Sequence, residues 1–226
     1  KHAGVESKSD PPPPVTTKKY HRGYQYYQTE QGERITYSLP GGKTFASIHA
    51  VHVHINIRCF REATGTTSPT LEKLYCEADS NRNGYISWDE VERFQRVLIR
   101  EYRYRSNDTA LRPDQFLEQY GGDCEDFALV TAGLLRFWNW QPFIASFAAS
   151  VYAPGHALCL VYSETVPAGF GYYTLKDYYT AEGDPLKDGY YIPIDYEYVG
   201  ATSNAMEDGW ILRKMYVPEN IYGVRM

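Results

Sequence analysis

The spacing of hydrophobic residues predicts strands in the first third of the chain. Residues 34–60 fit this pattern, because Arg34–Leu39 precedes a Pro-Gly-Gly turn and apolar residues then alternate from Val51 to Cys59. In this register His52 and His54 lie on the opposite face, which we interpret as solvated rather than as half of a metal site. The sequence therefore predicts a β segment here.

From residue 69 onward the apolar spacing becomes helical. It predicts two short helices around Leu71–Tyr75 and Val91–Leu98, and a third from Cys124 to Leu135. Beyond Pro142 the pattern is that of strands, expected over 143–152, 157–163, 171–175 and 190–196. This order of strands, helices, one central helix and a final antiparallel sheet predicts an α+β fold.

Composition divides the chain into four expected segments. They are a disordered Pro-rich tail (1–20), an N-terminal β segment (21–67), a helix–loop–helix (68–103) and a main domain (104–226). The chain opens Lys-His-Ala with no apolar signal core, so we expect a fragment from which any targeting segment has been removed. The tail is a candidate tether to a surface.

The charge balance narrows the expected partners. The 226 residues hold 23 Lys and Arg against 28 Asp and Glu, a net charge of −5, which disfavours nucleic-acid binding. No apolar run approaches the ~20 residues that a transmembrane helix needs. A monomer is favoured, and whether Cys59 and Cys76 form a disulfide stays open.

The sequence between the first two helices matches a calcium-binding loop. Residues 79–90 carry oxygen donors at EF-hand positions one, three, five, seven, nine and twelve, with glycine at position six. The predicted ligands are Asp79, Asn81, Asn83, Tyr85 through its carbonyl, Ser87 and Glu90. The alternative is an Asn-rich turn that binds no metal. With two charged ligands the Ca²⁺ affinity should be modest, which favours an extracytoplasmic protein that is secreted, periplasmic or surface-tethered.

A cysteine, a histidine and an aspartate form the candidate catalytic group. Cys124 follows a double glycine at the expected first turn of a helix, where the helix dipole stabilises anions. His156 opens a later strand and Asp195 lies on another. A thiol nucleophile, an imidazole base and an orienting carboxylate follow the logic of a catalytic triad.

These residues carry a resemblance to a known family. The motifs Gly122-Asp-Cys-Glu-Asp-Phe-Ala128, Gly155-His-Ala157 and Ile192-Pro-Ile-Asp195 resemble the transglutaminase-like cysteine protease superfamily, over roughly residues 109–200. The resemblance implies a papain-like α+β core in which a central helix packs on an antiparallel sheet.

The resemblance also implies the roles of the three residues. Cys124 is the nucleophile, His156 the general base and acid, and Asp195 the carboxylate that orients the imidazole. We expect Asp195 to hold Nδ1, so that Nε2 faces the thiol. The chain departs from the family pattern in having Leu158 where an aromatic residue is common. It also has an insertion near 176–189 that carries the rival acids Asp177, Asp184 and Asp188.

The predicted function is a calcium-binding thiol hydrolase that cleaves an amide, with a protein or peptide as the favoured substrate. One alternative is a protein-glutamine acyltransferase that cross-links proteins, and another is an inactive, calcium-stabilised binding or adhesion module. The Cys124 N–H is the expected first oxyanion donor, and Gln115 or Gln119 the second. Six tyrosines around the insertion either wall a substrate groove or cover a sheet edge: Tyr172, Tyr173, Tyr178, Tyr179, Tyr190 and Tyr191.

Overall fold

The computed structural model describes residues 13–148, 155–196 and 209–218. Within these ranges the helices are α1 (Ile48–Thr64), α2 (Pro69–Glu77), α3 (Trp88–Glu101), α4 (Pro113–Glu118) and α5 (Cys124–Phe137). The strands are β1 (Val15–His21), β2 (Tyr24–Gln31), β3 (Arg34–Ser38), β4 (Thr44–Phe45), β5 (Arg103–Tyr104), β6 (Gly121–Gly122), β7 (Pro142–Ala148), β8 (Gly155–Ser163), β9 (Tyr173–Leu175), β10 (Gly189–Ile194) and β11 (Ile211–Tyr216). No helix in the described part of the chain is long and apolar enough to cross a membrane.

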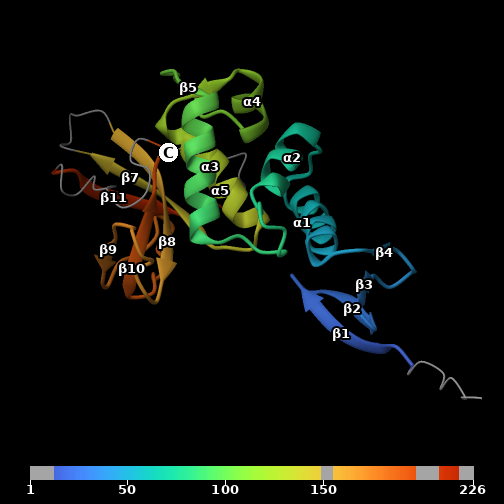
Figure 1. The fold of residues 1–226 in the computed structure, drawn as a ribbon. Coiled ribbons are helices and arrows are strands. Elements are labelled where there is room, and N and C mark those ends of the chain that lie inside the picture. The colour runs from blue at the N-terminus through green and yellow to red at the C-terminus, as the bar shows by residue number, and fades with distance from the viewer. Residues whose placement is uncertain (1–12, 149–154, 197–208, 219–226) are drawn as a thin grey trace, which may run out of the picture.

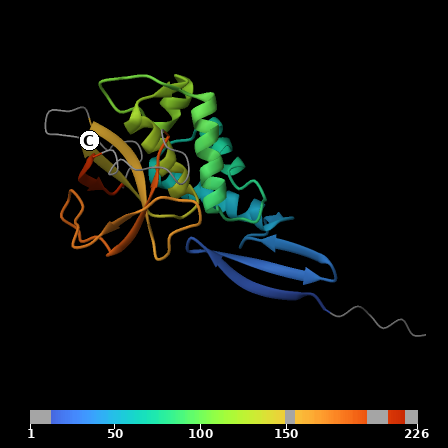
Figure 2. The same ribbon diagram turned by 60° about the vertical axis from the view of Figure 1, so that its left-hand side comes forward.

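The N-terminal sheet projects away from the rest of the molecule, on the far side of α1 (Figures 1 and 2). Its strands pair antiparallel in the order β1-β2-β3-β4, and Arg22 and Gly23 form the β1–β2 turn with positive φ angles of 50° and 80°. The predicted disordered tail over 1–20 is wrong for Val15–Tyr20, which pair with β2. These residues are exposed, and the four between Val15 and Tyr20 are polar, so the segment lacks the apolar alternation by which a strand is recognised. Residues 1–12 lie outside the described residues.

Helix α1 occupies the segment where strands were predicted. The Ser47 side chain accepts the Ala50 N–H at its start, and Gly65 ends it in the left-handed conformation. Val51 and Ile55 are buried one turn apart against the N-terminal sheet. The predicted strand from Val51 to Cys59, and with it an all-β segment over 21–67, is wrong. An apolar residue at every second position also places residues i and i+4 on one helix face.

The expected solvated face does not exist in this helix. His52 is 1% exposed and Asn56 is fully buried, because the β1–β2 hairpin covers the side of α1 that carries them. His54 is half-buried. The interpretation of His52 as a solvated residue is therefore wrong.

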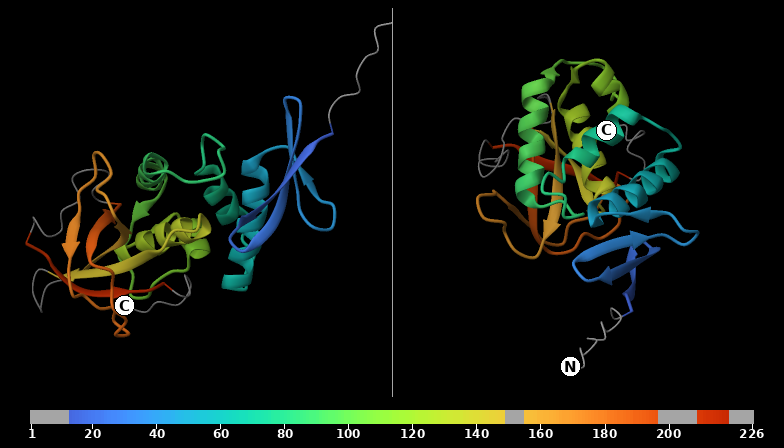
Figure 3. Two further views of the ribbon diagram at one scale, coloured as in Figure 1. Left: turned by 90° about the horizontal axis from the view of Figure 1, so that it is seen from below. Right: turned by 45° about the vertical axis from the view of Figure 1, so that its right-hand side comes forward.

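The predicted helix pair and the antiparallel sheet are both present. Helices α2 and α3 flank the 79–87 loop, and the C-terminal sheet has the strand order β11-β7-β8-β10-β9. Helix α5 packs on β7 and β8 of this sheet, as seen from below in Figure 3. The predicted α+β fold, with a central helix on an antiparallel sheet, is confirmed. The short helix α4 and the strand β11 were not predicted.

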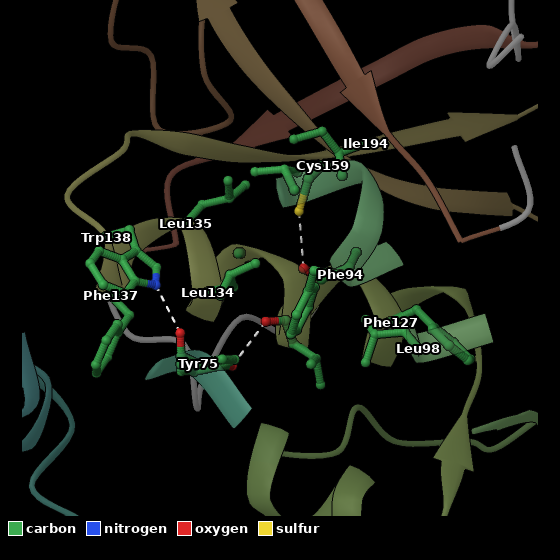
Figure 4. Packing of buried hydrophobic residues seen from close by; sticks show 14 of the residues in the cluster. Tyr75, Phe94, Leu98, Phe127, Leu134, Leu135, Phe137, Trp138, Cys159 and Ile194 are labelled. Atoms are coloured by element: carbon green, nitrogen blue, oxygen red, sulfur yellow. Dashed lines mark hydrogen bonds between the residues drawn. The ribbon is translucent and has the colours of Figure 1, made fainter. Parts of the chain in front are cut away.

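The core between these layers fixes the helix pair to α5 (Figure 4). The buried Tyr75 hydroxyl donates to the Val130 carbonyl at 2.9 Å, and Trp138 Nε1 donates to the Tyr75 carbonyl at 2.8 Å. Gly133 makes room for this ring, since a Cβ there would lie 2.2 Å from the Tyr75 oxygen. The calcium-type loop is thus held in a fixed position relative to α5.

Candidate active site and calcium loop

Cys124 is the first residue of α5, as the sequence predicts. Asp123 caps the helix by accepting the N–H groups of Glu125 at 3.1 Å and Asp126 at 3.4 Å. Burial, and then the charge of Asp126, raises the pKa of Asp123, and the main-chain donors partly offset this. The cap therefore uses the N–H groups of the two residues after Cys124 and not that of Cys124 itself.

Asp126 is a buried anchor behind Cys124 that the sequence analysis did not identify. Its carboxylate accepts the Leu111 N–H and the Asn107 amide at 2.6 Å each, and the Asp123 N–H at 2.9 Å. The side chain is fully buried. It therefore holds the 105–111 loop against the start of α5, which a capping box alone would not do.

The double glycine before Cys124 is required by close packing. A Cβ on Gly122 would lie 2.1 Å from the Asp126 carboxylate, and one on Gly121 would lie 1.9 Å from the Arg103 carbonyl oxygen. Gly121 also has a φ of +141°, which side-chain-bearing residues rarely adopt. The glycines let β6 pair with β5 directly in front of the helix start.

His156 and Asp195 meet across neighbouring strands. Asp195 follows β10 by one residue and His156 is the second residue of β8, so the β8–β10 register brings the two ends together. His156 Nε2 lies 2.6 Å from Asp195 Oδ2, with 8% and 2% of the two residues exposed. A hydrogen bond from the buried Cys159 thiol to the Ala128 carbonyl, 3.0 Å long, ties β8 to α5.

The surroundings of the His156 imidazole favour its protonated, positively charged form. Burial alone would lower the pKa of His156, but hydrogen bonds to Asp195 and Cys124 and their negative charges outweigh it and raise the pKa to about 10. Because Nε2 faces Asp195, Nδ1 is the nitrogen left for the Cys124 sulfur. The predicted ring orientation, with Nδ1 on the aspartate, is wrong. Which nitrogen faces the acid depends on the strand geometry, and sequence does not encode it.

Two aromatic side chains border this pair, and the sequence analysis missed both. The rings of Tyr196 and Trp210 lie 5.9 and 5.7 Å from the His156 ring, between centroids. Tyr196 also stacks on Phe127 of α5 at 4.5 Å. The only feature of the sequence that points to Tyr196 is its position directly after Asp195. Trp210 has no motif around it.

The alternative acids and the candidate second oxyanion donors lie in other parts of the structure. Asp177, Asp184 and Asp188 are exposed in the loop between β9 and β10, where Asp188 accepts the Asp177 N–H. Gln115 Oε1 accepts the Arg112 N–H and so caps α4, whereas Gln119 is exposed near Cys124 in sequence.

The tyrosines divide between core and surface. Tyr173 and Tyr191 belong to the core of the C-terminal sheet, while the other predicted tyrosines are exposed: Tyr172, Tyr178, Tyr179 and Tyr190. The four cysteines are free thiols, so Cys59 and Cys76 are not bridged. Cys159 is fully buried, and burial raises its pKa, in keeping with a core residue.

The predicted calcium ligands lie on one closed loop. Asp79 accepts main-chain N–H groups from Asn83 at 3.1 Å and Gly84 at 2.8 Å, and Gly84 has the positive φ of 85° that this turn needs. The Asn81 and Asn83 side-chain oxygens each accept a main-chain N–H two residues further along. The second oxygen of Asp79 also lies 2.7 Å from His49 Nδ1.

Glu90 closes the other side of the loop. Its oxygens accept N–H and O–H groups from Ser80 and Ser87 and the N–H of Asn81, at 2.9–3.2 Å. Burial alone would raise the pKa of Glu90, but these donors hold it below its ordinary value, so the group is an anion at neutral pH.

The donor set fits calcium in kind. Two carboxylates, two amide oxygens, a hydroxyl and a carbonyl match a hard cation. The two Glu90 oxygens already accept five hydrogen bonds. A calcium ion bound by both oxygens would therefore require the Ser80 and Asn81 donors to turn away. Among the residues that the structure describes, no group of three His, Cys, Asp or Glu side chains could hold a metal by itself. Any ion must therefore rely on the asparagine, serine and main-chain oxygens.

No family model matches this sequence, and no curated protein matches it. Among solved structures, EGTA-treated LapG of Legionella pneumophila is similar with a TM-score of 0.44 and 16% identity, covering 74% of this chain and 82% of that one. Calcium-bound LapG has a TM-score of 0.42 and 14% identity, covering 76% and 90%. A proposed cysteine protease from Cytophaga hutchinsonii has a TM-score of 0.40 and 12% identity, covering 90% and 66%. Because their TM-scores are below 0.5, these similarities carry no argument about function.

Proposed function

We propose that this protein is a calcium-binding, transglutaminase-like thiol hydrolase that cleaves an amide bond in a protein or peptide. The observation that carries the proposal is the buried His156–Asp195 contact of 2.6 Å, with Cys124 near enough to the same imidazole to help raise its pKa. An imidazolium beside a thiol at a helix start is the arrangement of an activated cysteine.

The proposed reaction uses the three residues in order. The Cys124 sulfur attacks the amide carbon, and the main-chain N–H of Cys124 is the first donor to the oxyanion. The protonated His156 then gives its proton to the leaving amine, and the C–N bond breaks to leave a thioester. A water molecule, deprotonated by the now neutral His156, attacks the thioester, releases the acyl group as a carboxylic acid and regenerates the Cys124 thiolate beside the protonated His156. Asp195 fixes the ring and stabilises its positive form throughout.

Calcium has a structural part in this proposal. Asp79, Asn81, Asn83, Ser87, Glu90 and the Tyr85 carbonyl would hold it, and bound calcium would lock the loop between α2 and α3. Because Tyr75 bonds α2 to α5, a rigid loop supports the helix that bears Cys124. A loop with only two charged ligands suits a compartment rich in calcium, so we place the protein outside the cytoplasm.

A peptide-library experiment tests the proposal. The full chain is incubated in calcium with peptides from a digested proteome, and mass spectrometry identifies new termini. Cleavage that disappears in Cys124→Ala, at an unchanged melting temperature, supports a hydrolase. Attachment of an added fluorescent amine to glutamine-containing peptides without cleavage would instead indicate the acyltransferase. A wild-type Cys124 that iodoacetamide does not alkylate near neutral pH would indicate an inactive binding module.

A further inference from the structure

A histidine from outside the helix–loop–helix contacts the first predicted calcium ligand. His49 is the second residue of α1, and its Nδ1 lies 2.7 Å from Asp79 Oδ2. The Asp79 side chain is fully buried, and that of His49 is 18% exposed. An EF-hand loop takes its protein ligands from its own twelve residues, so this contact is not part of the motif. The sequence analysis therefore did not identify His49.

The two oxygens of Asp79 are occupied to different degrees. Oδ2 accepts the Gly84 N–H at 2.8 Å and also faces His49, whereas Oδ1 accepts the main-chain N–H of Asn83 at 3.1 Å. A carboxylate only accepts hydrogen bonds, so His49 Nδ1 is the donor to Oδ2. Each carboxylate oxygen has about two acceptor positions. Both positions of Oδ2 are therefore filled, and Oδ1 is the oxygen that can face an ion.

The His49 ring is held in place by the elements around it. Its centroid lies 6.3 Å from that of the Trp138 ring, which is 5% exposed at the end of α5. The loop packs on the same part of α1, because a Cβ on Gly84 would lie 3.2 Å from the Ile48 side chain and 2.9 Å from His52 Nδ1. The start of α1 thus packs directly against the loop and keeps the imidazole beside it.

We propose that His49 is a positioning residue for calcium. By donating to Oδ2 it fixes the rotation of the Asp79 carboxylate, so that Oδ1 faces the ion before the ion arrives. The inference rests on the calcium binding proposed above and adds a residue that the loop does not contain. Hydrogen bonds from outside the ligand shell orient ligands in this way, and losing one typically costs about 10–100-fold in metal affinity.

Calorimetric titration of the chelator-treated full chain with Ca²⁺ tests the proposal. His49→Ala should weaken calcium binding about 10–100-fold. His49→Asn should restore most of this loss, because Asn Nδ2 and His Nδ1 are the same number of bonds from Cβ and both can donate. Melting curves in chelator measure the effect of each variant on the fold alone. A lower Tm in chelator together with wild-type calcium affinity would mean a purely structural role and would overturn the proposal.

His54→Ala is the matched control on the same helix. His54 Nδ1 lies 3.3 Å from Lys43 Nζ, and its ring lies 5.3 Å from that of Phe45, so both contacts are outside the loop. This variant should bind calcium as the wild type does. An equal loss in His54→Ala, or no recovery in His49→Asn, would overturn the proposal.

The wild-type titration separates this inference from the proposed function. If the wild type binds no calcium, the metal site of the proposed function is wrong and the role of His49 is wrong with it. If the wild type binds calcium and His49→Ala binds it equally well, only the role of His49 is wrong.

Discussion

Two histidine sites in this protein are both removed from water, one fully and one in part, but differ in the charge that they favour. His156 lies 2.6 Å from the Asp195 carboxylate, and its pKa is raised to about 10. His21 stacks on His52 with 3.8 Å between ring centroids, and its hydrogen-bond partner is the Asn56 amide oxygen. Burial, followed by the charge of His52, lowers the pKa of His21 to about 4.

The difference comes from the partners rather than from burial. His52 donates to or accepts from neutral groups, with Nδ1 2.7 Å from the Gly84 carbonyl, and burial lowers its pKa as well. The charge of Asp79 opposes this lowering only in part, and the Asp79 carboxylate is already bonded to His49. A buried histidine with neutral partners stabilises packing between elements. A buried histidine paired with a carboxylate keeps a proton that it can transfer during catalysis.

The largest expected effect separates the two sites directly. In His156→Gln, turnover of the peptide found in the library experiment should fall about 10²–10⁴-fold, because the general acid and base is lost. His52→Gln should leave turnover unchanged and lower the free energy of unfolding by about 0.5–3 kcal/mol. Steady-state assays and urea titrations measure the two quantities. If the two variants lose turnover equally, the assignment of roles is wrong.

The next effect tests the carboxylate. Asp195→Asn should slow single-turnover acylation by roughly 10–10³-fold, less than the loss of the base itself, because a thiol depends less than a hydroxyl on activation. The matched control is Asp184→Asn, an exposed acid on the β9–β10 loop, which should acylate at the wild-type rate.

The pH profile gives the same test a second readout. The raised pKa keeps the His156 ring protonated in the folded protein up to about pH 10. The ion pair with Asp195 stabilises the fold fully below about pH 6.5, the ordinary pKa of histidine. This stabilisation and the activity decline as the pH rises through about 10. In Asp195→Asn the alkaline limb should move to lower pH. An unmoved limb would show that Asp195 does not set the His156 charge.

Calcium should act on the structural histidine region and leave His156 unaffected. At a hundredfold excess over Kd, binding adds ~2.7 kcal/mol to stability, which corresponds to a rise of about 5–10 °C in Tm. Glu90→Gln should abolish this rise. In NMR spectra, calcium should shift the ring signals of His52, which contacts Gly84, and leave those of His156 in place. No difference between calcium and chelator in Tm would contradict the metal site.

The smallest effect is acid sensitivity of the N-terminal sheet. The His21 pKa is depressed, so the stability that depends on its neutral ring is present above about pH 6.5 and is lost as the pH falls toward 4. After allowance for solvent screening of this half-buried ring, the loss should be about 1 kcal/mol, or 2–4 °C in Tm. Carboxylates also titrate in this range, so the measurement is the difference between wild type and His21→Gln. If Tm falls equally with decreasing pH in wild type and His21→Gln, the prediction is wrong.

The sequence predicts the His156 site better than it predicts the His52 site. The motif around Cys124 and the histidine that opens β8 are local signals, and they led to the right elements because capping, glycine packing and strand alternation act between neighbours in the chain. The same local rules failed for α1, because an apolar residue at every second position satisfies a strand and a helix at once. Only the β1–β2 hairpin packed over His52 and Asn56 decides between them.

The sequence by itself determined the kinds of groups available: a thiol at a helix start, a histidine at a strand end, acids further on and a loop of calcium-type donors. Tertiary structure alone decided which nitrogen of His156 faces Asp195, and that Asp126 and Gly122 pack behind Cys124. Local propensities depend on a few neighbouring residues, whereas charge partners and cavities depend on strand register and on how separate elements pack.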